Sequence, residues 1–324
     1  MAWSSCWSES AGVSVPRGIG NLKQLETLEI VDINQTSVKA IKELGELLQL
    51  RKLSVVTKEA TKLKCKVFCD AIQKLTSLSS LNVDGTLHHL SNGTLEWVHI
   101  ISSPPPMLKT LKLLGCIGAT PCWFGDLTHL VKLYLKGSQL KEEGKVIEIL
   151  GTLPNLMYLH LGWSSYVADK LAFRIGAFPN LKKLDTMGLW EVREVEFEDS
   201  TAPQLEMIDI SGCTLKSGII GINHLPRLKE ISLCYEGPVG QFAVLQSEVD
   251  AHPNSPVLRL ERRQLEDDPG DDVVQVEEAT GESSSHHPEP AAAAQSAQSQ
   301  GVAMATTNIR MTPPAYCIRL CSEE

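Results

Sequence analysis

The sequence is poor in aromatic residues, has no surplus of positive charge and contains no long hydrophobic run. Aromatic side chains make up 5% of the 324 residues although 43% are hydrophobic, so aliphatic side chains must supply the core. The net charge is -9, with 30 basic and 39 acidic residues, which is not the basic footprint of a nucleic-acid-binding protein. No stretch approaches the roughly 18 apolar residues that a membrane span needs. We therefore expect neither a membrane span nor nucleic-acid binding.

A secretion signal is also missing from the start of the sequence. Residues 1–10 contain no basic segment, and no apolar segment of the usual length follows them. The nine cysteines are odd in number and scattered along the chain. Because disulfides are rare in reducing compartments, we expect a cytoplasmic protein with reduced thiols.

Motifs that indicate catalysis or nucleotide binding are missing too. The nearest approach to the phosphate-binding loop GxxxxGK[ST] is Gly144-Lys145, where Gln139 replaces the first glycine and Val146 replaces the hydroxyl residue. The sequence has neither the nucleophile elbow GxSxG nor the metalloprotease motif HExxH. We therefore predict no enzyme activity and no cofactor, and an enzyme with an unrecognised site is the less favoured alternative.

One pair of cysteines raises the question of a metal site. Cys65 and Cys69 are four residues apart in a segment that is expected to be helical. A structural zinc site needs four ligands, usually from closer cysteine pairs, and no histidine pair with suitable spacing is nearby. Buried or half-buried free thiols explain the pair better, so we predict no metal.

One hydrophobic pattern recurs along the chain, L-x-x-L-x-x-L-x-L with other aliphatic residues substituting. Nine copies share this register, and their third anchors are 22 to 30 residues apart, close to the roughly 20–29 of leucine-rich repeats. These anchors are Leu28, Leu53, Leu81, Leu111, Leu133, Leu159, Leu184, Ile208 and Ile231. In the L-x-L part, alternate residues point to opposite sides of a short strand. The leucines therefore face inward, and neighbouring strands stack around one continuous core.

This pattern predicts an α/β leucine-rich-repeat solenoid with a curved parallel sheet on its concave side. Helices and irregular loops form the convex side, because Ser37 to Leu48 and Lys62 to Leu75 place apolar residues at helical intervals. A short helix from Pro238 to Val249 and an edge strand from Val257 to Leu260 cap the C-terminal end. Cysteine stands at the Asn/Cys position of the repeat in only two copies, so we expect irregular curvature.

Three segments follow from this interpretation. Residues 18–260 form the repeat domain of about nine irregular repeats with its cap, and residues 1–17 are a leader or the remnant of an earlier repeat. Residues 261–324 are a low-complexity tail with 12 acidic and 4 basic side chains. High charge with low hydrophobicity does not offset the entropy lost on ordering a chain, so we expect this tail to be disordered.

The middle residue of each strand is expected to face the concave surface, where a partner protein would bind. These positions are mostly polar and become acidic toward the C-terminus, and Tyr158 stands beside them. Two tyrosines among charged residues favour a binding surface over an ordinary solvated face, because aromatics are enriched in binding hot spots. The candidate residues are Glu29, Ser54, Asn82, Lys112, Tyr134, Tyr158, His160, Asp185, Asp209 and Ser232. Trp123, Trp163 and Trp190 lie just beyond strands, and we expect them to pack in the core or in loops.

Several stretches resemble the repeats of a known protein family. They are Val15–Leu25, Leu153–Leu156, the run EVREVEFE at Glu191–Glu198, Gly221–Pro226 and the closing His252–Asn254. All are similar to repeats of plant nucleotide-binding leucine-rich-repeat disease-resistance proteins, of the coiled-coil class found in grasses. The resemblance covers about residues 13–260. The coiled-coil and nucleotide-binding domains of that family are absent from this sequence.

The resemblance implies a role in intracellular defence. In that family the repeats recognise a pathogen effector or a host protein and restrain a nucleotide-binding switch. We therefore expect a protein-recognition module whose partner is an effector, a host protein or a nucleotide-binding receptor domain. The chain would be the repeat domain of a longer receptor or a stand-alone product. The alternative is a general intracellular leucine-rich-repeat scaffold or adaptor without an immune role.

Overall fold

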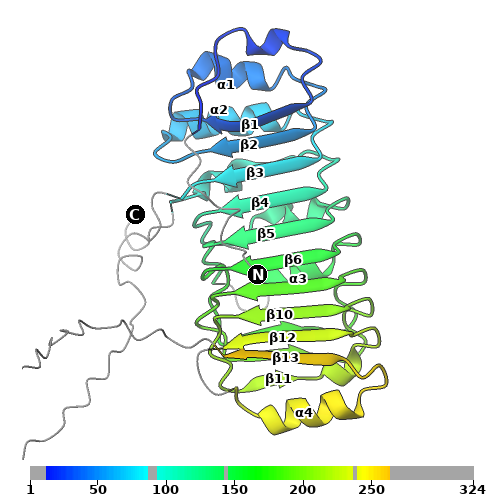
Figure 1. Ribbon diagram of the computed structural model, residues 1–324. Helices are drawn as coiled ribbons and strands as arrows, with labels where there is room; N and C mark the ends of the chain where they lie inside the picture. The colour runs from blue at the N-terminus through cyan, green and yellow to red at the C-terminus, as the bar shows by residue number, and fades with distance from the viewer. Residues whose placement is uncertain (1–11, 87–92, 142–144, 236–238, 263–324) are drawn as a thin grey trace, which may run out of the picture. The chain divides into compact units, whose positions relative to one another are not determined.

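The computed structural model describes residues 12–86, 93–141, 145–235 and 239–262, all within the unit Met1–Asp267. Parallel strands stack in one ten-stranded sheet (Figure 1). In sheet order they are β1 (Thr27–Asp32), β2 (Lys52–Val56), β3 (Ser80–Asp84), β4 (Thr110–Leu114), β5 (Lys132–Lys136), β6 (Tyr158–Gly162), β8 (Lys183–Met187), β10 (Met207–Ser211), β12 (Glu230–Tyr235) and β13 (Val257–Arg262). The predicted parallel repeat sheet is confirmed, including its last edge strand. The first two residues of the predicted tail, 261 and 262, belong to β13, and the rest of the tail lies outside the described residues. The three segment limits stay a prediction.

The repeated leucines form the core, as the pattern predicts. From Leu47 to Leu233, every anchor of the second to ninth copies is buried. Leu159 is 0% exposed, and Thr186, which replaces an aliphatic residue, is 1% exposed. Because each repeat buries its anchors against the next repeat, no single strand could retain this structure alone.

The first copy departs from the predicted pattern. Leu28 pairs with Leu53, but Val31 rather than Ile30 pairs with Val55, because a bulge interrupts β1. Ile30 has a φ of 60°, and this extra residue resets the alternation so that Val31 is 0% exposed. The first anchor, Leu22, is 53% exposed. The repeat pattern makes Ile30 the last anchor of this copy and predicts that it faces inward, and this prediction is wrong because Val31 takes that place.

Helices lie on the side of the sheet that carries the core, as expected (Figure 1). They are α1 (Val38–Leu44), α2 (Lys62–Ile72), α3 (Lys145–Gly151), α4 (Phe242–Ala251) and the 3-10 helices η1 (Ile19–Asn21), η2 (Glu96–Ile100), η3 (Cys122–Asp126) and η4 (Ile222–His224). Ser37 and Thr61 begin α1 and α2, because each side-chain oxygen accepts a hydrogen bond from a backbone N–H of the first turn. None of the helices in the described ranges is long and apolar enough to cross a membrane.

Three later repeats contribute strands to a second, three-stranded parallel sheet. It contains β7 (Lys170–Phe173), β9 (Glu194–Phe197) and β11 (Gly218–Ile220), in the order β11-β9-β7. Phe173 and Phe197 stack with ring centroids 4.8 Å apart. We predicted helices or irregular loops here, but strictly alternating residues such as Glu194-Val-Glu-Phe197 are a signal for strands.

Asparagines tie successive repeats together at the turns that precede the strands. The Nδ2 atom of Asn155 donates to the carbonyl of Thr128, and that of Asn180 donates to the carbonyl of Pro154, each at 2.7 Å. Asn254 donates in the same way to Pro226 at 2.5 Å. These bonds satisfy carbonyls of the previous turn and help to align one repeat on the next.

Replacing a core leucine should therefore destabilise the solenoid far more than replacing an exposed leucine of the same motif. We expect Leu159→Ala to lower the free energy of unfolding by about 2–5 kcal/mol, because it leaves a cavity in the shared core. Leu22→Ala is the matched control and should change stability by less than about 0.5 kcal/mol. Urea denaturation followed by circular dichroism measures both. Equal effects of the two substitutions would contradict this account of the core.

Candidate protein-binding surface

The predicted polar residues form one continuous row on the open face of the sheet, the face opposite the helices. Strand pairing aligns eight of them without a shift, and Arg259 of β13 joins the row next to Ser232. In order they are Ser54, Asn82, Lys112, Tyr134, His160, Asp185, Asp209 and Ser232. Glu29 has no partner in this register because it lies within the bulge of β1. We call the aligned residues from Ser54 to Arg259 the central row.

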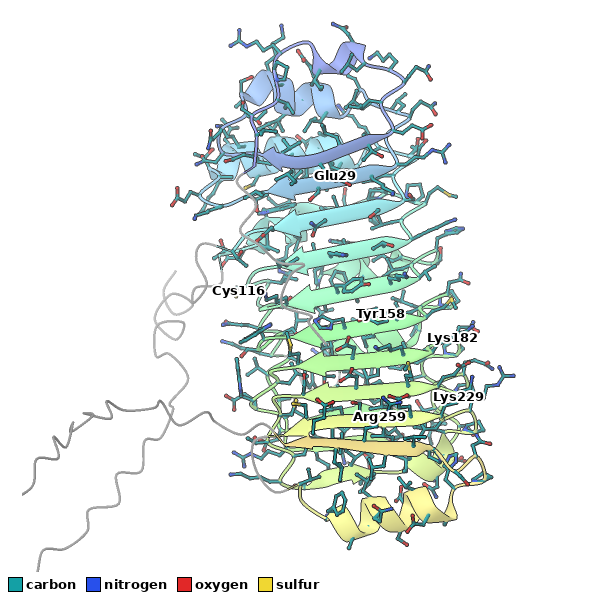
Figure 2. The ribbon with its side chains drawn as sticks, viewed as in Figure 1. Glu29, Cys116, Tyr158, Lys182, Lys229 and Arg259 are labelled. Carbon is teal, nitrogen blue, oxygen red and sulfur yellow. The ribbon has the colours of Figure 1, made fainter. Side chains whose placement is uncertain are left out.

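Tyr158 belongs to a parallel row two positions earlier in each strand. It pairs with Lys132 of β5 and Lys183 of β8, and Lys183 pairs in turn with Met207. Figure 2 shows Tyr158 on the open face, midway along the stack of strands. This neighbouring row therefore brings Tyr158 against the central row, as we expected of a flanking residue.

A cluster of aromatic and acidic side chains forms where β5, β6 and β8 meet. Asp185 accepts a hydrogen bond from the hydroxyl of Tyr158 at 2.6 Å, and its other oxygen lies 3.2 Å from Nδ1 of His160. The ring of Tyr134 lies 5.0 Å from that of Tyr158 and 5.9 Å from that of His160, measured between centroids. We call Tyr134, Tyr158, His160 and Asp185 the aromatic–acid cluster.

Asp185 holds the cluster together through its charge. It is 8% exposed, and burial alone would raise its pKa. Hydrogen bonds from His160 and Tyr158, with the nearby charge of Lys183, outweigh burial and lower the pKa below its usual value. Burial and the bond to Asp185 raise the pKa of the Tyr158 hydroxyl, which therefore stays a donor at neutral pH. The cluster thus contains a stable anion held by neighbouring donors.

The pKa of Asp209, the next residue in the central row, is shifted in the opposite direction. Burial first, and then the charge of Asp185, raise its pKa. The two carboxylates occupy paired positions on adjacent strands, where like charges repel. A cationic group of a partner placed near them would relieve that repulsion.

Lysines border the aromatic side of the cluster. The Lys112 ammonium lies 4.6 Å from the ring centroid of Tyr134, and that of Lys183 lies 6.0 Å from the centroid of Tyr158. Both distances fit cation–π contacts. Along the central row, the face changes from basic and aromatic at β4 to β6 to acidic at β8 and β10, while Lys183 of β8 lies in the neighbouring row.

Near its N-terminal end, the central row carries two neutral polar residues, Ser54 and Asn82. Asn82 donates from Nδ2 to the hydroxyl of Ser54 at 2.9 Å. The Asn82 Oδ1 atom is buried and has no hydrogen-bond partner among the described residues. Ser54 and Asn82 thus form a polar pair, separate from the aromatic–acid cluster.

Gly162 is part of the surface, and its role was not predicted. A Cβ atom added there would lie 2.8 Å from Nε2 of His160, so the ring of His160 occupies the space above this glycine. Gly162 pairs with Lys136 and Met187 in the third outward row. The alternation of the strand marks Gly162 as outward-facing, which is the signal that a neighbouring ring could cover it.

The tryptophans divide into two groups. Trp123 is 2% exposed and packs in the core, as predicted. Trp163 and Trp190 are 43% and 44% exposed and contact each other at 5.6 Å between ring centroids. Packing in the core or in loops was predicted for all three tryptophans, but the exposure of Trp163 and Trp190 was not.

The cysteine pair of α2 is buried, as predicted for free thiols. Burial first, and then the nearby Cys65 and Asp70, raise the pKa of the Cys69 thiol to about 12. Its Sγ lies 3.4 Å from the carbonyl oxygen of Trp97. No group of three or more His, Cys, Asp or Glu side chains within the described ranges could hold a metal ion.

A family model described as a leucine-rich repeat region matches residues 6–258. The chain belongs to the leucine-rich-repeat family. Curated relatives include disease resistance protein RPM1 of Arabidopsis thaliana, 28% identical over 71% of this chain, and disease resistance protein PIK6-NP of Oryza sativa subsp. japonica, 26% identical over 70% of it. The matches cover 24% and 23% of those relatives. The chain thus matches the repeat region of plant nucleotide-binding leucine-rich-repeat disease-resistance proteins and spans about a quarter of their length.

Solved structures of other repeat proteins are more distant. An internalin from Listeria monocytogenes has 15% identity and a TM-score of 0.38, with 79% of this chain and 80% of that chain covered. A Toll-like receptor in a complex described as TLR13-ssRNA13 has 15% identity and a TM-score of 0.39, with 75% of this chain and 44% of that chain covered.

The lowered pKa of Asp185 should make the stability of this leucine-rich-repeat domain sensitive to acid. A carboxylate whose pKa is lower in the folded state stabilises the fold above its unfolded-state pKa, and this contribution disappears as the pH falls through the folded-state pKa. We expect the urea midpoint of the wild type to fall more steeply than that of Asp185→Asn between about pH 5 and pH 3. Identical pH profiles would contradict the proposed role of Asp185 in the cluster.

Asp209→Asn is a matched substitution with the opposite expected sign. A carboxylate whose pKa is higher in the folded state contributes stability only in its protonated form, and that contribution is lost as the pH rises through the folded-state pKa. Removing its charge should therefore raise the urea midpoint at pH 7. A lower midpoint would show that Asp209 is held by favourable contacts rather than opposed by Asp185.

Proposed function

We propose that this chain is a protein-recognition module of plant defence that binds a pathogen effector or a host protein through the open face of its sheet, the concave face expected of the solenoid. The observation that supports it best is the aromatic–acid cluster between basic and acidic parts of that face. Its relatives are disease resistance proteins, and we infer that the chain acts in the cytoplasm as such a receptor's repeat module.

The chemistry of the face suits recognition of another protein. Tyrosines present large and fairly rigid surfaces, and aromatic residues are enriched among the residues that dominate binding energy. Asp185 fixes the positions of Tyr158 and His160, so the surface is ordered before a partner arrives. The change from lysines to carboxylates along the sheet would orient a partner of complementary charge.

Affinity capture can test the open face directly. The recombinant chain is immobilised and exposed to extracts of healthy and infected plant tissue, and bound proteins are quantified by mass spectrometry. We expect the combined substitution of Tyr134, His160, Asp185 and Asp209 by alanine to reduce specific partners by at least about tenfold, since loss of a hot spot costs roughly 2 kcal/mol or more. Partners found only in infected extracts would be effectors, and partners found in both would be host proteins.

The control places an equal disturbance on the second sheet. Alanine at Lys170, Glu194 and Glu196 removes two ion pairs of 2.8 Å there and leaves the open face intact. Binding that survives the open-face substitutions but is lost in this control would overturn the proposed surface. Urea denaturation of each variant confirms that it is folded.

Gly162→Ala tests the geometry of the cluster without removing any of its groups. The added Cβ would need the space that His160 Nε2 occupies at 2.8 Å, so the flexible imidazole should move away from Asp185. We expect near-normal stability and weaker capture of the partners that the wild type retains. Unchanged capture would mean that the position of His160 does not matter for recognition.

A further inference from the structure

Trp163 and Trp190 form an exposed aromatic pair in loops that follow neighbouring strands of the main sheet. Every other tryptophan or phenylalanine whose burial the structure describes is less exposed; Trp97 and Trp123, for example, are 8% and 2% exposed. The two rings meet edge to face, with an interplanar angle of 67°. Exposed apolar surface of this kind marks sites of interaction, since water solvates it poorly.

The backbone holds this pair in place. Trp163 and Ser164 have φ values of 49° and 55°, a left-handed conformation that side chains other than glycine rarely adopt. Their N–H groups donate to Met187 and Gly188 of the next repeat at 2.6 and 2.9 Å. The carbonyl of Trp190 accepts a hydrogen bond from the hydroxyl of Thr214 at 3.2 Å. Hydrogen bonds to the next repeat therefore hold both loops that present the indoles, although the backbone conformation at Trp163 is unfavourable.

The pair adjoins the aromatic–acid cluster. Trp163 follows Gly162 directly, and the ring of His160 lies against that glycine. Figure 2 shows the edge at which strands end near Cys116, and β6 ends at this same edge with Gly162. A partner bound to the open face could therefore extend over this edge onto the tryptophans.

Lys136 gives the site its charge. Its Nζ atom lies 5.7 Å from the ring centroid of Trp163, and Lys136 pairs with Gly162 in the strand ladder. Burial lowers the pKa of Lys136, and the charge of Asp84 opposes that effect. Lys136 places a positive charge beside the indoles, so a partner carboxylate there would add to its present contacts and a partner cation would be repelled.

We propose that Trp163, Trp190 and Lys136 form an anchor site for an acidic and apolar segment of a partner protein. An apolar side chain of the segment packs on the two indoles, and an adjacent aspartate or glutamate pairs with Lys136. This inference rests on the proposed function, because it extends the same binding surface beyond the end of the strands.

A peptide selection on the whole chain tests the proposal. A phage-displayed library of random dodecapeptides is selected against the immobilised protein, and enriched peptides are synthesised for fluorescence anisotropy. We expect peptides that combine aspartate or glutamate with leucine, isoleucine or phenylalanine. Trp163→Ala and Trp190→Ala should each weaken their binding by at least about tenfold, as expected of a hot spot. Lys136→Glu should weaken it similarly and reduce its dependence on salt.

Matched controls separate this site from general effects. Ile175→Ala removes an apolar side chain that is 71% exposed elsewhere on the chain, and Lys66→Glu reverses an exposed charge on α2. Both variants should bind the peptides normally. Three outcomes would each overturn the proposal: enrichment of basic peptides, no enrichment of any peptide, or peptide binding that the tryptophan substitutions leave unchanged.

The same peptides distinguish this site from the open face. Tyr134→Ala and Asp185→Ala alter the aromatic–acid cluster and leave the tryptophans in place. Peptide binding that is weakened by the cluster substitutions but not by the tryptophan substitutions would contradict the anchor site and leave the proposed function standing. Peptide binding that is weakened only by the tryptophan substitutions would support the anchor site and contradict a central role of the aromatic–acid cluster.

Discussion

Parallel pairing between equivalent strands is the constraint on which the rest of the structure depends. From β2 to β13, each strand of the ten-stranded sheet pairs with the next strand of that sheet without a shift in register. A slip by one residue would turn every anchor out of the core and every polar residue into it. Because the anchors are buried almost completely, burial of the leucines fixes the register, and the register then decides which side chains meet on the open face.

The aromatic–acid cluster is a consequence of this alignment. Equivalent positions on adjacent strands are about 4.8 Å apart, so residues that are some 25 positions apart in the chain become neighbours. Tyr158 reaches Asp185 diagonally across one strand gap, and His160 faces Asp185 directly. The same alignment places Asp209 beside Asp185, and burial together with the charge of Asp185 raises the pKa of Asp209. The same strand alignment thus produces both the ordered carboxylate of Asp185 and its repulsion with Asp209.

The two sides of the solenoid differ in how regularly their secondary structure repeats. The strand side repeats with one geometry from β2 onward, whereas the opposite side carries α-helices, 3-10 helices or the strands β7, β9 and β11 in different repeats. Variable spacing between anchors, 22 to 30 residues, accompanies this change. The turns at the ends of the strands vary as well, and those that follow β6 and β8 expose Trp163 and Trp190. Recognition features can therefore arise at these turns without disturbing the core.

The repeat, the parallel sheet and the central row from Ser54 to Ser232 were determined by the sequence itself, because burial imposes a period that the leucines display openly. The tertiary structure alone decided the bulge at Ile30, since a local backbone conformation overrides the alternation there. It also decided the contact between Tyr158 and Asp185 and the exposure of the Trp163–Trp190 pair. Both features depend on which side chains neighbouring repeats bring together. The periodic pattern of the sequence shows which way each residue faces, but it does not give the distances between side chains of different repeats.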